Sequence, residues 1–293
     1  MTPYHYDYAV IGGDLRQVYL ALELAAEHKK VCCYALCQPM NHNGIQTFSS
    51  LEAAVSNSAC IICPIPFTKD GMVLNQKAMK GTIQVKQFFK FLKPDHRLYA
   101  GCIPKDFYRT ASQMNIVLFD FMKEESLSYF NSIATAEGMI CEAIQNSPIN
   151  LQGSKCAVFG YGKCGRTLTE KLSNLSCHVT VVSSDFKELA QAFVFADETC
   201  LIKDVSSQIG TYDFIFNTIP SVILTRELLR KTDESVTILD IASAPGGIDF
   251  TAAKELSRNA GSYPGLPGKY APLSSAKAIN STIKKFERSH SCL

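Results

Sequence analysis

The stretch CAVFGYGKCGRTL, at residues 156–168, joins an apolar, strand-like run to three closely spaced glycines and the start of a helical pattern. A dinucleotide-binding turn needs one glycine to bend sharply after the strand, a second to let the backbone approach a pyrophosphate, and a third to seat the helix on the sheet. Gly160, Gly162 and Gly165 have the spacing for these roles, and another strand-like run, HVTVVS, follows at residues 178–183. The candidate pyrophosphate-binding residues are therefore Gly160, Gly162, Lys163, Cys164 and Gly165.

A second glycine turn, AVIGGDLRQ, lies at residues 9–17. Gly12 matches the first glycine of a dinucleotide turn, but Asp14 and Gln17 stand where the other two would be, and a carboxylate there would repel a pyrophosphate. One interpretation is a Rossmann-like domain that keeps the turn for structure alone. The other rests on Arg16, because the helix macrodipole disfavours a cation in the first turn, whereas a ligand carboxylate that Arg16 clamps with two N–H groups would explain it. On that interpretation Asp14 and Arg16 belong to a site for an acidic substrate.

Strand-like runs alternate with helical patterns along the chain, which predicts parallel sheets covered by helices. We expect an α/β fold of two Rossmann-like domains with parallel sheets, joined by interdomain helices. The N-terminal substrate or catalytic domain is expected at residues 1–130, a linking helix at 131–150, and the nucleotide-binding domain at 151–293. The last helical stretch, from Ser274 to Arg288, is expected to pack back toward the N-terminal domain.

The composition favours a soluble globular protein that binds small ligands or protein partners. The chain has 293 residues, 46% of them hydrophobic, and a formal charge of +2, with no long basic run, so nucleic acid is not an expected partner. No apolar run approaches the roughly 20 residues of a membrane span, and the N-terminus lacks signal-peptide features, so we expect a cytoplasmic protein without a membrane anchor. Twelve cysteines are expected to pack as small apolar residues; Cys60 and Cys63 have metal-ligand spacing, but no second pair accompanies them, and no metal site is expected.

The choice between NAD and NADP depends on the end of the strand at residues 178–183. An acidic side chain there would hold the ribose diol of NAD, whereas hydroxyl groups or arginine would accommodate the extra phosphate of NADP. Ser183 and Ser184 can donate to a phosphate, Lys187 can add positive charge, and Asp185 comes late for the diol-binding role. This favours NADP, with NAD as the alternative. Another interpretation is that the serines cap a helix that begins near Asp185.

Two further strands end in small, polar turns that can line a nicotinamide ring. The motifs are FNTIPSVIL at residues 216–224 and DIASAPGGIDF at residues 240–250. The candidate residues in them are Asn217, Thr218, Ile219, Asp240, Ala242 and Ser243.

Six motifs, in chain order, are AVIGGDLRQ, FNSIATAEGMICEAIQ, GYGKCGRTL, NTIPSVIL, DIASAPGGIDF and PGLPGKYAP. Together they resemble the dipicolinate synthase family of spore-forming bacteria, in its A-subunit branch, over nearly the whole chain. The resemblance implies an NADP cofactor, oxidation of dihydrodipicolinate to dipicolinate (pyridine-2,6-dicarboxylate) during sporulation, a place in the mother-cell cytoplasm, and a second, flavoprotein-like subunit. The chain departs from the family pattern at Ala134, where proline is usual, and at Ser184, where arginine often stands, and the latter bears on the NADP preference.

The implied chemistry bears on the remaining candidates. Dihydrodipicolinate carries two carboxylates for Arg16 and helix N-terminal amides to hold, and aromatisation helps its proton leave after the hydride. On this chemistry a strong general base is not expected, which accounts for the absence of histidine from the motifs. If there is a base, Glu137 is the candidate, the alternative being a first-turn glutamate that the helix dipole favours. The other candidate substrate-binding residues are Ser132, Thr135 and Pro267, the last in a stretch that is either a plain loop or a rigid pocket wall.

Two other functions stay open. A 2-hydroxy-acid or amino-acid dehydrogenase would share the two-domain plan, but such enzymes usually carry a histidine or lysine acid/base, and none is evident. A non-catalytic NADP-binding subunit that regulates a partner would carry the same glycine turn. The sequence does not decide whether the chain forms a homo-oligomer.

Overall fold

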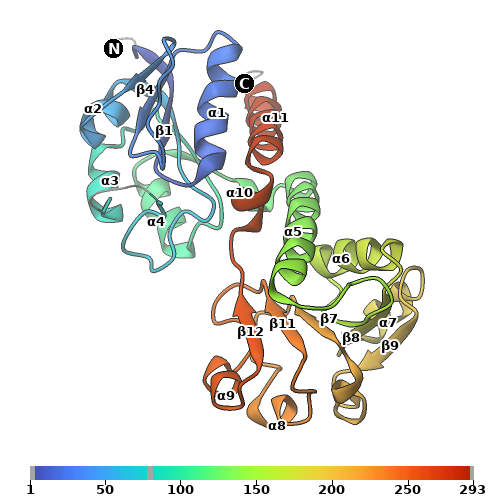
Figure 1. Ribbon diagram of the computed structural model, residues 1–293. Helices are drawn as coiled ribbons and strands as arrows, with labels where there is room; N and C mark the ends of the chain where they lie inside the picture. The colour runs from blue at the N-terminus through green and yellow to red at the C-terminus, as the bar shows by residue number, and fades with distance from the viewer. Residues whose placement is uncertain (1–3, 78–81, 291–293) are drawn as a thin grey trace. The chain divides into compact units, whose positions relative to one another are not determined.

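The computed structural model describes residues 4–77 and 82–290. Within these residues the chain forms two six-stranded sheets, both parallel throughout and flanked by helices (Figure 1). The backbone contacts divide the chain into unit 1, which comprises Met1–Phe130 and Ala271–Leu293, and unit 2, which comprises Asn131–Tyr270. The predicted α/β class with two Rossmann-like parallel sheets is confirmed.

The sheet of unit 1 has the strand order β3-β2-β1-β4-β5-β6. Its central strands are apolar, as is typical of strands that helices cover on both faces. Successive residues of β1 alternate between two cores, with Ala9 and Ile11 in one and Tyr8 and Val10 in the other. The strands are β1 (Tyr6–Ile11), β2 (Val31–Tyr34), β3 (Ile45–Thr47), β4 (Ser58–Ile62), β5 (Arg97–Ala100) and β6 (Val117–Asp120).

The C-terminal helix α11 (Pro272–His290) lies along α1 (Leu15–Ala26) and completes one core of unit 1 (Figure 1). Asn280 Nδ2 donates a hydrogen bond to Glu27 Oε1 at 2.7 Å, and Lys284 Nζ donates to the same oxygen. The helical stretch expected to pack back toward the N-terminal domain is thus grouped with unit 1, and unit 2 ends at Tyr270 and not at residue 293. The other helices of unit 1 are α2 (Leu51–Ser56), α3 (Val85–Phe91), α4 (Lys105–Gln113) and the 3-10 turn η1 (Phe121–Lys123).

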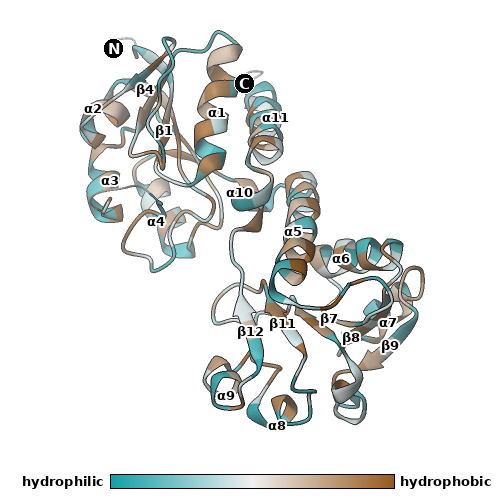
Figure 2. Ribbon diagram, in the orientation of Figure 1, coloured by the Kyte–Doolittle hydropathy of each residue, from teal (hydrophilic) through white to brown (hydrophobic). Residues whose placement is uncertain are grey.

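The sheet of unit 2 has the order β12-β11-β10-β7-β8-β9. Its inner strands β7 and β8 are buried at every residue but the first, as expected for strands covered on both faces, and Figure 2 colours β7 largely as hydrophobic. The strands are β7 (Lys155–Phe159), β8 (His178–Ser183), β9 (Glu198–Leu201), β10 (Phe214–Asn217), β11 (Thr237–Asp240) and β12 (Asn259–Ser262).

The long helix α5 (Glu125–Asn146) begins in unit 1 and continues into unit 2, and the whole of the expected linking segment at residues 131–150 falls within unit 2. The other helices of unit 2 are α6 (Lys163–Asn174), α7 (Phe186–Ala192), α8 (Arg226–Leu229), α9 (Phe250–Glu255) and α10 (Leu266–Tyr270), with 3-10 turns η2 (Val205–Ser207) and η3 (Ile209–Thr211).

Each sheet has a switch point where the strand order reverses. In unit 1 this point lies between β1 and β4, and in unit 2 it lies between β7 and β10. Parallel α/β sheets bind ligands outside the carboxyl ends of the strands at such points. Both glycine turns of the sequence follow the first strand of their unit, so each turn borders its own switch point.

Candidate functional site

The turn between β7 and α6 leaves room for a ligand at its middle glycine. A Cβ at Gly160, where φ is +90°, would lie 2.5 Å from Thr218 Oγ1, and a Cβ at Gly165 would overlap the Gly160 carbonyl oxygen. A Cβ at Gly162, the N-cap of α6, would meet no protein atom within 4 Å. The fold itself therefore requires the outer two glycines, whereas Gly162 keeps its backbone accessible at a helix N-terminus, as pyrophosphate binding needs.

The loops after β10 and β11 are shaped by a buried amide–carboxylate pair. Asn217 Nδ2 donates to Asp240 Oδ1 at 2.9 Å and to the Ile219 carbonyl oxygen at 3.0 Å. Asp240 also accepts hydrogen bonds from the backbone N–H groups of Ala242, at 2.9 Å, and Gly247, at 2.8 Å. Both side chains are fully buried, so Asn217 and Asp240 organise the loops and do not themselves reach a ligand.

The loop residues that remain accessible are the smaller ones. Thr218, Ile219 and Ala242 are half-buried, and Ser243 is exposed. The Thr218 hydroxyl donates to the Phe159 carbonyl oxygen at 2.8 Å, which ties this loop to the end of β7. These four residues are the ones that a nicotinamide bound at the switch point of unit 2 would touch.

At the tip of β8 the Ser183 hydroxyl already has partners within the protein, although the sequence suggested that it could donate to a phosphate. The buried Ser183 hydroxyl donates to Glu188 Oε2 at 2.5 Å and accepts from the Asp185 N–H at 3.1 Å. Asp185 is the N-cap of α7, because its carboxylate accepts from the Lys187 N–H at 2.7 Å, and Ser184 is exposed. Sequence reasoning missed Glu188, although its place three residues after a capping aspartate was a readable signal that it belongs to the first helical turn.

The first glycine turn holds a buried ion pair. Asp14 caps α1, and its carboxylate receives Arg16 Nε at 2.9 Å and Arg16 Nη2 at 2.8 Å, while Arg16 Nη2 also donates to the Ile65 carbonyl oxygen. The two side chains are 10% and 5% exposed. Burial alone would raise the pKa of Asp14, but the hydrogen bonds and charge of Arg16 outweigh it and lower that pKa below its usual value. The guanidinium expected to hold a substrate carboxylate thus has an internal carboxylate partner.

The candidate residues on α5 face different surroundings. Ser132 is buried, with its Oγ 2.8 Å from Thr167 Oγ1 on α6, and the Thr135 hydroxyl donates to the Asn131 carbonyl oxygen at 2.8 Å. Glu137 is 53% exposed and accepts from Lys171 Nζ at 3.0 Å.

Glu137 lies far from the glycine turn, because its partner Lys171 is near the C-terminal end of α6. Along α6, Lys171 lies eight residues beyond Lys163, a distance of about 12 Å at a rise of 1.5 Å per residue. The structure therefore places the Glu137 carboxylate at the far end of α6, a position that disfavours the role of general base. Pro267 lies half-buried in α10, next to Leu266, whose Cβ would lie 2.8 Å from a Cβ at Gly138 of α5.

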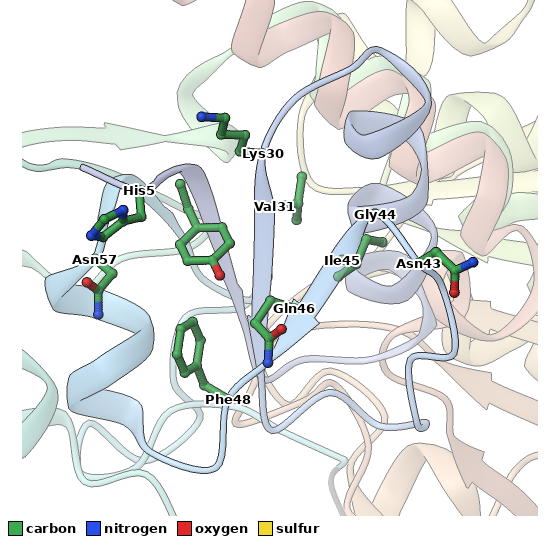
Figure 3. Close-up of a pocket in the computed structure, with 10 residues that line it drawn as sticks. His5, Lys30, Val31, Asn43, Gly44, Ile45, Gln46, Phe48 and Asn57 are labelled. Atoms are coloured by element: carbon green, nitrogen blue, oxygen red, sulfur yellow. The ribbon is translucent and has the colours of Figure 1, made fainter. Parts of the chain in front are cut away.

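A separate hollow opens at the amino-terminal side of the unit 1 sheet. Figure 3 shows His5, Lys30 and Asn57, which immediately precede β1, β2 and β4, together with Gln46 and Phe48 around it. Because parallel sheets bind ligands at the carboxyl ends of their strands, this hollow does not belong to the candidate site.

Metal-binding and membrane-spanning features are absent from the described part of the chain. Within residues 4–77 and 82–290 no three His, Cys, Asp or Glu side chains gather as a metal-binding group. Cys60 and Cys63 are both buried, and burial raises the pKa of the Cys63 thiol well above its usual value. None of the described helices combines the length and apolar character needed to cross a bilayer.

Comparison with known proteins gives consistent matches. Residues 7–122 match the family model of the N-terminal domain of the dipicolinate synthase A-subunit, and residues 148–254 match a family model of putative NAD(P)-binding domains. The chain is 29% identical over 290 residues to the dipicolinate synthase A-subunit of Bacillus subtilis (strain 168), covering 94% of each chain.

Two crystal structures are similar to the chain over almost its full length. The dipicolinate synthase A-subunit from Bacillus halodurans has a TM-score of 0.85 and 25% identity, covering 96% of this chain and 97% of that one. The A chain of dipicolinate synthase from Bacillus subtilis has a TM-score of 0.81 and 25% identity, covering 99% of this chain and 97% of that one.

Proposed function

We propose that the chain, which matches dipicolinate synthase A-subunits over almost its full length, is the part of a dipicolinate synthase that oxidises dihydrodipicolinate to dipicolinate with a nicotinamide dinucleotide. The observation that carries the proposal is the turn after β7. There the protein crowds Gly160 and Gly165 but leaves the backbone at Gly162 accessible, and the turn lies within the NAD(P)-binding match. A turn kept only for structure has no need of a glycine at that middle position.

The chain's own residues bind and position the reactants. The backbone N–H groups at the start of α6 hold the pyrophosphate, since a helix N-terminus favours an anion. The accessible residues Thr218, Ile219, Ala242 and Ser243 line the nicotinamide. The bound dinucleotide supplies the hydride acceptor. Loss of a proton then completes the aromatic ring of the product, and aromatisation drives that step without a strong base.

A dicarboxylate substrate needs cationic groups, and we assign one carboxylate to Arg16. The Asp14 carboxylate and the Ile65 carbonyl oxygen fix the guanidinium at the carboxyl ends of β1 and β4, the switch point of unit 1. A guanidinium that is already ordered loses little conformational freedom when a ligand binds. The competing interpretation is that Arg16 only neutralises Asp14. Ser132, Thr135 and Pro267 are secondary candidates for contacts with the substrate.

The relatives are named as one lettered component of a synthase, which implies a second component. We propose that the partner of this chain is the flavoprotein-like component of dipicolinate synthase and that the enzyme acts in the mother-cell cytoplasm of a sporulating bacterium. The sequence favours NADP as the dinucleotide, and that choice stays a prediction. The contacts at the tip of β8 argue for a different selectivity.

The test is a reconstituted assay. The purified chain is mixed with freshly prepared dihydrodipicolinate and either NAD or NADP, with and without the partner protein, while nicotinamide absorbance is followed. Reduction of the dinucleotide with formation of dipicolinate supports the proposal, and a folded Gly162→Asp variant should be inactive. Tight dinucleotide binding with no turnover under any of these conditions would point instead to a non-catalytic, dinucleotide-sensing protein.

A further inference from the structure

The tip of β8 carries a fixed carboxylate. In a dinucleotide-binding domain the ribose of the adenosine half lies at the end of the second strand, which in unit 2 is β8. Ser183 is the last residue of β8, and its hydroxyl donates to Glu188 Oε2 at 2.5 Å. Glu188 itself is half-buried, and the hydrogen bond from Ser183 goes to one of its two carboxylate oxygens. Glu188, in the first turn of α7, therefore places a negative charge at the end of β8, where the sequence indicated none.

Few of the described groups at this tip could receive a 2′-phosphate. The Ser183 proton is committed to Glu188, and its oxygen accepts from the Asp185 N–H at 3.1 Å. The Asp185 carboxylate adds a second negative charge beside the exposed Ser184. Lys187 is an exposed cation of this segment, and it stands between the two acidic residues in the chain.

Arg166 is another cation near this part of unit 2, and it has partners of its own. Its Nη2 donates to Gln191 Oε1 on α7 at 2.8 Å, and its guanidinium lies 5.4 Å from the centre of the Tyr161 ring. A carboxylate is the acceptor that a ribose diol prefers, and it repels a phosphate ester on the same ribose. The arrangement thus matches the unphosphorylated ribose.

We propose that Glu188 selects NAD over NADP by accepting hydrogen bonds from the ribose hydroxyls, with Ser183 orienting its carboxylate. This rests on the proposed function, because it needs a dinucleotide bound at the turn after β7. It also reverses the preference that the hydroxyl groups of the sequence suggested. If Glu188 served only the helix, its charge would stabilise the first turn of α7 through the helix dipole and would not affect the choice of dinucleotide.

Calorimetric titration of NAD and NADP into the purified chain tests the proposal without relying on turnover. The wild-type chain should bind NAD at least roughly tenfold more tightly than NADP, the scale of one hydrogen bond to a charged group. Glu188→Gln should weaken NAD binding and strengthen NADP binding, so that the ratio of the two affinities falls by roughly tenfold or more. The matched control is Glu234→Gln, which removes the same charge from an exposed residue three positions before β11, on the other side of β7 from β8 in the sheet.

The outcomes separate the two proposals. Equal or tighter binding of NADP by the wild-type chain would overturn the selectivity while leaving the proposed function intact. Equal ratios of NAD to NADP affinity in Glu188→Gln and Glu234→Gln would likewise overturn the selectivity and leave the proposed function intact. Binding of neither dinucleotide by the folded chain would overturn the proposed function itself. Should Glu188→Gln fail to fold, the wild-type ratio alone still decides the selectivity.

Discussion

The three glycines of the turn after β7 should respond differently to the same small substitution. At Gly162 the backbone has a φ of −68°, which alanine adopts readily, and the added Cβ would meet no protein atom within 4 Å. Gly162→Ala should therefore change the free energy of unfolding by no more than about 1 kcal/mol, the scale of a change in helix capping. The methyl group would nevertheless stand where a pyrophosphate approaches the backbone. We expect dinucleotide affinity to fall roughly ten- to hundredfold, as when a hydrogen bond to a charged group is lost.

Alanine at the outer two glycines should damage the fold itself. At Gly160 the left-handed backbone costs alanine about 1–2 kcal/mol, and the new Cβ would lie 2.5 Å from Thr218 Oγ1. At Gly165 the Cβ would overlap the Gly160 carbonyl oxygen, so α6 would have to move away from the strand. Overpacking of this kind costs about 1–3 kcal/mol. We expect a total loss of roughly 2–5 kcal/mol at Gly160 and roughly 1–3 kcal/mol at Gly165.

Two measurements on each variant separate binding from folding. Urea unfolding gives the change in stability, and calorimetric titration gives the dinucleotide affinity. The reasoning predicts a stable Gly162→Ala protein that binds weakly, beside two destabilised proteins at Gly160 and Gly165. A stable Gly162→Ala protein with wild-type affinity would show that no ligand approaches this turn, and the assignment of the site would be lost.

Three further predictions concern Arg16, Glu137 and His96. Arg16→Lys keeps the charge but loses the planar pair of donors, so kcat/KM should fall roughly ten- to hundredfold while dinucleotide affinity stays unchanged. Steady-state kinetics near wild type would mean that Arg16 only neutralises Asp14 and binds no substrate. Glu137→Gln should leave kcat within about twofold of wild type, because its carboxylate pairs with Lys171 at the far end of α6, and a steep loss in the same assay would restore Glu137 as the general base. Burial lowers the pKa of His96 from its ordinary value of 6.5 to about 4, so the unfolded chain gains a proton below pH 6.5 that the folded chain does not. Stability should fall by up to about 3 kcal/mol from pH 6.5 to pH 4, and His96→Asn, whose amide oxygen can still accept from the Lys93 N–H, should show a shallower loss in urea unfolding; an identical pH dependence in both proteins would rule out this role for His96.

The sequence predicts the glycine turn well because each of its requirements is local. A strand, a bend and a helix start follow one another within residues 156–168, and their geometry depends on backbone conformation and the absence of a side chain. The parallel sheets follow for a similar reason, since alternating strands and helices leave few other ways to bury both strand faces.

The hydrogen-bond partners of the polar and charged side chains could not be predicted as well from the sequence. The sequence shows that Asp14 and Arg16 are close together in the chain. It does not show whether the guanidinium points to a ligand or to the Asp14 helix cap, because that depends on the Ile65 carbonyl oxygen, which lies after β4. The Ser183 hydroxyl looked free because its partner, Glu188, lies one helical turn further on. Side-chain direction in the first turn of a helix decides such contacts, and residue spacing alone does not fix it.

Unit 1 is built from two separate pieces of chain, Met1–Phe130 and Ala271–Leu293, with the whole of unit 2 inserted between them. Synthesis on the ribosome runs from the N-terminus, so unit 2 is complete once residue 270 has emerged, whereas unit 1 must wait for α11. Until then Leu20 and Leu24 of α1 lack Ile279 and Ile283, the α11 residues with which they share a core. Before α11 has docked, a chain whose unit 2 is already folded would thus still expose part of the apolar face of α1.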